Sequence, residues 1–136
     1  MIRLFLDANV LFTAAHNPGG KAAFIISPGA EKAWEVYTSV FAVEEARRNL
    51  KEKFPSAEKK LDEFLSEITI VREPAISSLC PKGLKEKDRP IFQAAHMCRA
   101  SHLITGDLEH FGSFMEKPEK TFDIIILTPA KFLSSL

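Results

Sequence analysis

The chain has 136 residues, a length that fits one domain, and 46% of its residues are hydrophobic while 26% are charged. This balance excludes disordered, collagen-like and coiled-coil chains and favours a soluble globular protein with a sizeable core. The 18 basic and 18 acidic residues cancel. Because no global positive field exists, any nucleic-acid site must be local or built around a metal ion.

The N-terminus and the two cysteines bear on the location of the protein. Cys80 and Cys98 stand in no metal-binding spacing, which is typical of reduced thiols in the cytoplasm. No apolar run approaches the roughly 18 residues that a membrane span needs. The first apolar run is broken at Asp7, so it predicts a strand rather than a signal peptide. We therefore expect a cytoplasmic protein with no membrane partner.

Short apolar segments recur along the chain and predict strands. They cover residues 2–6, 36–38, 68–71, 102–105 and 124–127. Continuous apolar runs of this length are typical of parallel strands that are buried on both faces.

Segments with helical spacing lie between these strands. They cover residues 20–26, 40–54, 56–67, 89–100 and 131–136. Ser39, Ser56 and Asp88 are the candidate N-caps of three of these helices. The alternation predicts an α/β fold, a three-layer α/β/α sandwich with a central parallel sheet of about five strands, in a single domain over residues 1–136.

Acidic residues follow two of the predicted strands. Asp7 comes directly after residues 2–6, and Asp107 follows residues 102–105 with only Gly106 between. In parallel sheets, ligands bind beyond the carboxyl ends of the strands. Asp88, at the start of a predicted helix, and Glu45, within another, complete the set of candidate acids.

Four acids in one pocket would suit metal-assisted hydrolysis of a phosphodiester. Close carboxylates repel one another and cannot all stay ionised without a compensating charge. Mg²⁺ and Mn²⁺ prefer oxygen ligands and supply that charge. A bound ion of this kind activates a water molecule and neutralises charge on the phosphate.

Each of these acids also has a purely structural explanation. Asp7 and Asp107 could form turns, and Asp88 could do no more than cap its helix. Glu45 lies off the apolar stripe of its helix, where Glu44 competes with it as a solvated residue. Spacing alone does not select Glu45.

Five segments, in order, resemble the PIN domain family, whose members are small Mg²⁺- or Mn²⁺-dependent ribonucleases and include many toxins of bacterial toxin–antitoxin pairs. The segments are residues 4–11 (LFLDANVL), 43–50 (VEEARRNL), 88–95 (DRPIFQAA), 103–107 with 110–112 (LITGD and HFG) and 127–133 (LTPAKFL). Together they extend over nearly the whole chain, and their order makes the resemblance fairly specific.

The resemblance implies catalytic and metal-binding roles for Asp7, Glu45, Asp88 and Asp107, with Mg²⁺ or Mn²⁺ as the cofactor. It places the second acid at Glu45 and makes Asn9 and Thr105 polar partners that orient a carboxylate or water. It implies a ribonuclease whose metal-activated water leaves 5′-phosphate and 3′-hydroxyl ends. The implied partners are an RNA substrate, an antitoxin protein and a second copy of the chain.

Charged residues near these acids add candidate contacts. Lys85, Lys87 and Arg89 flank Asp88 and could bind RNA phosphates, although a solvated surface explains them equally well. Glu109 could be a further ligand or a surface charge.

Other functions stay open at this point. The main alternative is a catalytically weak PIN-like module that binds RNA or protein, although the presence of all four acids argues against a decayed site. A phosphoryl-transfer enzyme of the DxD type would need an acid where Asn9 stands. A zinc site is disfavoured because the four histidines show no paired spacing.

Overall fold

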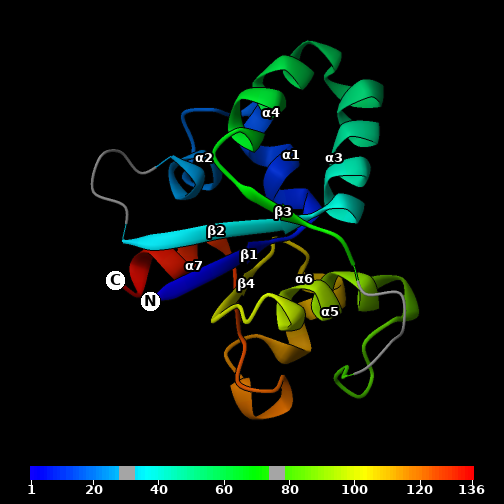
Figure 1. Ribbon diagram of the computed structural model, residues 1–136, viewed down its shortest axis with the longest axis vertical. Helices are drawn as coiled ribbons and strands as arrows, with labels where there is room; N and C mark the ends of the chain where they lie inside the picture. The colour runs from blue at the N-terminus through cyan, green and yellow to red at the C-terminus, as the bar shows by residue number, and fades with distance from the viewer. Residues whose placement is uncertain (28–32, 74–78) are drawn as a thin grey trace.

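The centre of the molecule is a parallel sheet, seen edge-on in Figure 1, in a computed structural model that describes residues 1–27, 33–73 and 79–136. The five strands are β1 (Ile2–Leu6), β2 (Trp34–Ser39), β3 (Thr69–Val71), β4 (His102–Ile104) and β5 (Ile125–Leu127). They pair in the order β3-β2-β1-β4-β5, and every pairing is parallel. The predicted α/β class and five-stranded parallel sheet are therefore confirmed.

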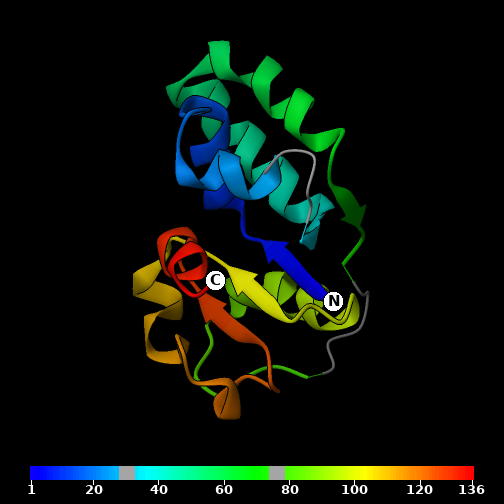
Figure 2. The same cartoon turned by 90° about the vertical axis from the view of Figure 1, so that its left-hand side faces the viewer.

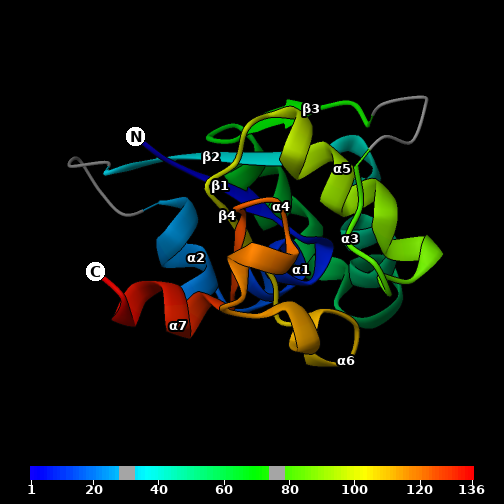
Figure 3. The same ribbon diagram turned by 90° about the horizontal axis from the view of Figure 1, so that it is seen from below.

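Helices cover both faces of this sheet (Figures 1 and 2). One layer contains α1 (Ala8–His16), α2 (Lys21–Ile26), α3 (Val40–Lys53) and α4 (Glu58–Leu65). On the other face, α5 (Arg89–Met97) packs against β2 and β4. The short α6 (Leu108–Phe111) follows β4, and α7 (Pro129–Ser134) lies beside α2 (Figure 3). In the described ranges, no helix has the length and apolar character of a membrane span.

Strand β1 lies at the centre of the sheet, between β2 and β4, with helices on both faces. Leu4, Phe5 and Leu6 have no exposed surface. An uninterrupted apolar run is what a strand in this position requires. From Leu4 to Leu6 the strand has no polar side chain, and the next residue is Asp7, where the strand ends.

Helix α1 is the largest element that the sequence analysis did not predict. Asp7 ends β1 and caps α1 in one step, with an extended backbone at φ −71° and ψ 161°. Its Oδ1 accepts a hydrogen bond from the Ala8 amide at 2.7 Å. No glycine or proline separates strand from helix, so the apolar run of β1 merges in sequence with the buried face of α1.

The three predicted N-caps have different outcomes. Ser39 caps α3 as predicted, and its hydroxyl accepts from the Ala42 amide at 3.2 Å. The prediction for Ser56 is wrong, because this residue lies in a 3₁₀ turn that Pro55 begins, and α4 starts at Glu58 without a side-chain cap. Asp88 occupies the N-cap position of α5, but its carboxylate makes no capping bond.

Two helix boundaries in the structure differ from the predicted ones because of the local backbone conformation. Helix α5 ends at Met97, not at residue 100, and Arg99 then adopts φ 57° to turn the chain into β4. Helix α7 begins at Pro129 and not at residue 131, since Thr128 Oγ1 accepts from the Lys131 amide at 3.1 Å.

The order of the strands contains a switch point between β1 and β4. From β1 the chain moves outward through β2 to β3, whereas from β4 it moves the opposite way to β5. At such a point the connections leave in opposite directions and open a crevice at the carboxyl ends of the two strands. Asp7 follows β1 at this crevice, and Thr105 to Asp107 follow β4.

Candidate metal centre

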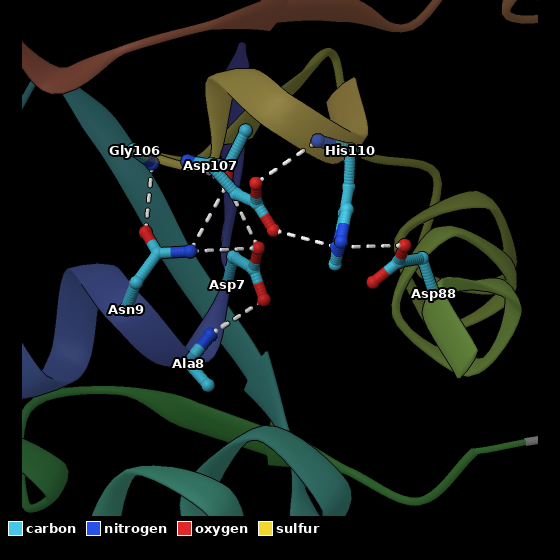
Figure 4. Close-up of polar contacts among 8 residues, drawn as sticks. Asp7, Ala8, Asn9, Asp88, Gly106, Asp107 and His110 are labelled. Atoms are coloured by element: carbon cyan, nitrogen blue, oxygen red, sulfur yellow. Dashed lines mark hydrogen bonds and ion pairs between the residues drawn. The ribbon is translucent and has the colours of Figure 1, made fainter. Parts of the chain in front are cut away.

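Asp7 is held at the end of β1 by a network that joins it to the end of β4 (Figure 4). Thr105 Oγ1 donates to Asp7 Oδ2 at 2.8 Å, and Asn9 Nδ2 donates to the same oxygen at 3.1 Å. The other end of the Asn9 side chain accepts from the Gly106 amide at 2.7 Å. Asn9 and Thr105, both expected to be polar partners, therefore contact Asp7 directly and fix the orientation of its carboxylate.

The ionised form of Asp7 is disfavoured at this position. Burial is the largest cause and, together with the negative charges of Glu45 and Asp107, it raises the pKa of Asp7 from 3.8 to about 6. The hydrogen bonds from Thr105 and from the Ala8 amide lower this pKa and oppose the effect only in part. The site therefore has an excess of negative charge that a cation would relieve.

Asp107 and His110 form one unit at the start of α6. Asp107 Oδ1 accepts from the His110 amide at 3.0 Å and so caps the helix. The cap places the two side chains on one side of a single turn, with His110 Nδ1 2.9 Å from Asp107 Oδ2. Because the Asp107 amide donates to Thr105 Oγ1 at 3.1 Å, this unit is tied to the network around Asp7.

Asp88 reaches the same place from another segment, at the end of the 3₁₀ turn Glu86–Asp88 that leads into α5. Its backbone is helical, at φ −94° and ψ −8°, and not in the extended conformation of a capping residue, so the carboxylate turns away from α5. Its Oδ2 lies 3.1 Å from His110 Nδ1. That oxygen is buried and, within the described residues, no group donates a well-oriented hydrogen bond to it.

These contacts bring three potential ligands together. Atoms of Asp88, Asp107 and His110 all lie within 4.8 Å of one another. In the part of the chain that the structure describes, this tight group does not extend to Asp7 or Glu45. Glu45 is half-buried on α3, and its negative charge contributes to the raised pKa of Asp7, so it lies in the neighbourhood of Asp7.

The donor set fits a divalent cation. Buried carboxylates are costly unless a positive charge compensates them. Asp88 Oδ2, which has no hydrogen-bond donor among the described residues, is an oxygen that such an ion would bind. Carboxylate oxygens are the usual ligands of Mg²⁺ and Mn²⁺. The residues that could hold an ion are Asp88 and Asp107, with His110 between them and Asp7 and Glu45 beside them.

The predicted RNA contacts are neighbours of Asp88 in the sequence. Lys85, Lys87 and Arg89 are exposed and flank the buried Asp88. Glu109 is exposed on α6 and is not part of the group of three ligands.

His110 is the member of the site that the sequence analysis missed. Its separation from Asp107 by three residues would bring the two side chains together on a helix. No helix was predicted there, and the approach of Asp88 depends on the packing of α5 against the sheet.

No protein-family model and no curated protein matches this chain. Solved structures do match it. VapBC2 from Rickettsia felis, bound to a DNA fragment from its promoter, aligns with a TM-score of 0.63 and 17% identity, over 93% of this chain and 98% of that one. PAE2754 from Pyrobaculum aerophilum aligns with a TM-score of 0.62 and 17% identity, over 98% of this chain and 88% of that one.

This chain has a PIN-like fold. The expectation drawn from the five sequence segments is confirmed at the level of the fold. At 17% identity the likeness establishes no chemistry, so the site of this PIN-like domain rests on its own geometry.

Proposed function

We propose that this chain is a divalent-metal-dependent endoribonuclease that uses Mg²⁺ or Mn²⁺. The observation that carries the proposal is the buried Asp88 Oδ2, to which none of the described residues donates a well-oriented hydrogen bond and which lies beside Asp107 and His110 near the carboxyl ends of β1 and β4. A carboxylate pocket at this point of a parallel sheet suits a cation better than an uncharged ligand.

We propose different roles for the residues of the pocket. A bound ion supplies the Lewis acidity that activates a water molecule and stabilises negative charge on the phosphate. We assign the ion to Asp88 and Asp107, with Asp7 and Glu45 as the further acids of the same pocket. Asn9 and Thr105 keep Asp7 in position through hydrogen bonds of 3.1 and 2.8 Å to its Oδ2.

Lys85, Lys87 and Arg89 are proposed to hold the RNA backbone. They are exposed beside an otherwise acidic pocket, where phosphate groups would approach. In a chain with no net charge, a local basic patch is the means by which a polyanion is held.

Cleavage of single-stranded RNA tests the proposal directly. We expect cleavage with Mn²⁺ or Mg²⁺, none with EDTA, and a loss of about a hundredfold or more in Asp7→Asn and Asp88→Asn. Asp62→Asn is the matched control, because Asp62 is exposed on α4 and pairs only with Arg47 in the described ion pairs. Sequencing of the product ends should show 5′-phosphates.

Cleavage that survives both EDTA and Asp88→Asn would contradict the proposal. No cleavage of any RNA, together with no specific Mn²⁺ uptake in titration calorimetry, would instead favour the alternative, a PIN-like module that binds RNA or protein with little turnover.

We further propose partner proteins, namely an antitoxin and a second copy of the chain. The similar structure from Rickettsia felis is that of VapBC2, bound to a DNA fragment from its promoter. In this chain, Phe24 is 50% exposed on α2 and Phe54 is 44% exposed after α3, so the helical layer carries apolar surface that a partner could cover. Light scattering of the chain alone and with the product of an adjacent small gene tests both partners.

A further inference from the structure

We infer that His110 is a metal ligand, and that the site for this reason prefers a first-row transition-metal ion such as Mn²⁺ to Mg²⁺. The inference deepens the proposed function and rests on it. It concerns a nitrogen donor that no part of the sequence analysis assigned to the site.

The position of the His110 ring is set by two independent elements. The capping bond from the His110 amide to Asp107 Oδ1, at 3.0 Å, fixes the turn of α6 that carries the ring. Asp88 comes from the start of a separate helix, α5. Figure 4 shows the ring between the two carboxylates. The side chain of His110 is only 12% exposed, so the ring is held and not free in solvent.

The hydrogen bonds of this arrangement are incomplete without an ion. Nδ1 lies 2.9 Å from Asp107 Oδ2 and 3.1 Å from Asp88 Oδ2, yet one ring nitrogen carries at most one hydrogen. Nδ1 can therefore donate a hydrogen bond to only one of the two carboxylate oxygens. Asp88 Oδ2 is the oxygen left buried without a well-oriented donor among the described residues. Two oxygens and a nitrogen that converge in this way suit a cation that accepts electron pairs from all three.

The spacing of the three atoms also suits coordination. An ion that holds ligands at about 2.1 Å and at right angles places neighbouring ligand atoms about 3 Å apart. The two separations from Nδ1, 2.9 and 3.1 Å, have this length. The ligand atoms of the three residues already lie within 4.8 Å of one another, so an ion needs little rearrangement of them.

The type of donor decides which ion is preferred. Mg²⁺ binds oxygen ligands and gains little from imidazole, whereas first-row transition-metal ions accept imidazole readily. The other three histidines have different neighbours. His16 stacks on Phe54, His96 packs against Phe122, and His102 packs against Phe132. Among the contacts between described residues, His110 is thus the histidine whose ring nitrogen faces carboxylates.

Electron paramagnetic resonance of Mn²⁺ bound to the full chain tests the inference without any RNA. In the wild-type protein we expect the Mn²⁺ signal to show coupling to a ¹⁴N nucleus. In His110→Asn we expect that coupling to disappear, because asparagine can still donate to the carboxylates but offers no nitrogen lone pair. We also expect the affinity for Mn²⁺ relative to Mg²⁺ to fall about tenfold or more.

His16→Asn is the matched control, since His16 is exposed in the last turn of the nine-residue helix α1, about 13 Å from Asp7 along the helix. His16→Asn should keep both the coupling of Mn²⁺ to ¹⁴N and the preference for Mn²⁺ over Mg²⁺. Mn²⁺ that binds the wild type without nitrogen coupling, with a Mn²⁺ preference unchanged in His110→Asn, would overturn the role of His110 and leave the proposed function standing. A wild-type protein that binds no Mn²⁺ would overturn both.

Discussion

Thr105 donates a hydrogen bond of 2.8 Å from its hydroxyl to Oδ2 of Asp7, and so joins two residues that are 98 positions apart in the chain. Thr105 has no exposed surface and Asp7 is only 5% exposed. The same hydroxyl accepts from the Asp107 amide at 3.1 Å. One buried side chain therefore sets the positions of the two strand-end acids relative to each other.

The substitution Thr105→Val is expected to lower the free energy of unfolding by about 1–3 kcal/mol, because it removes the hydroxyl but keeps the shape of the side chain. It should also raise the pKa of Asp7 further, since the lost bond favours the ionised form. Denaturant unfolding measures the stability. Thr105→Ser is the matched control and should recover most of it, and equal losses in the two variants would show that the hydroxyl is not responsible.

The substitution Asp7→Asn is expected to flatten the pH dependence of stability in the metal-free protein. The native pKa of about 6 lies above the ordinary value of 3.8, so between these values the native state holds a proton that the unfolded state has lost. Asp7 therefore stabilises the fold most at low pH, and its contribution is lost as the pH rises through about 6. From pH 5 to pH 8 this loss amounts to about 1.4 kcal/mol.

Unfolding of the metal-free wild type and of Asp7→Asn at pH 5 and pH 8 measures this difference. The asparagine variant should show a smaller drop in stability between the two pH values. A drop of the same size in both proteins would mean that Asp7 is already ionised at pH 5 in the native state.

Asp88→Asn is expected to weaken metal binding without lowering the stability of the metal-free protein. Without metal, the variant should unfold within about 1 kcal/mol of the wild type or be more stable, because the substitution removes a buried charge with an unsatisfied oxygen. With Mn²⁺ at a hundred times its dissociation constant, the wild type should gain about 2.7 kcal/mol and the variant far less. Equal stabilisation of both proteins by Mn²⁺ would place the ion away from Asp88.

The sequence could indicate the fold and part of the site for physical reasons that differ from residue to residue. Asp7 stands directly after β1 and Asp107 stands shortly after β4, so the rule that ligands bind at strand ends is sufficient to single them out. Glu45 lies on a helix face where Glu44 competes with it, and only the family resemblance favours it.

The role of His110 and the approach of the Asp88 carboxylate to it could not be predicted in this way. Both depend on a tertiary approach, in which a 3₁₀ turn delivers Asp88 in a helical conformation beside the first turn of α6. Local patterns such as capping preferences do not reveal this approach, and for Asp88 they predict a helix cap that the structure lacks.

Replacing Lys85, Lys87 and Arg89 together by alanine is expected to weaken RNA binding by a similar factor for all sequences. Each lost phosphate contact should reduce the slope of log affinity against log salt by about 0.7 for single strands, or about 2 for all three. Titration of a fluorescent oligonucleotide at several salt concentrations measures the slope. Lys59, exposed on α4, provides the control as Lys59→Ala, and equal slopes in the triple variant and the wild type would remove these residues from the RNA site.

Anomalous diffraction from crystals soaked in Mn²⁺ is the measurement that tests the metal centre most directly. We expect a peak between the carboxylates of Asp88 and Asp107, next to Asp7, and its absence in crystals of Asp88→Asn. Crystals that take up Mn²⁺ only elsewhere, with the carboxylates of Asp88 and Asp107 still flanking the His110 ring, would contradict a metal-dependent function for this pocket.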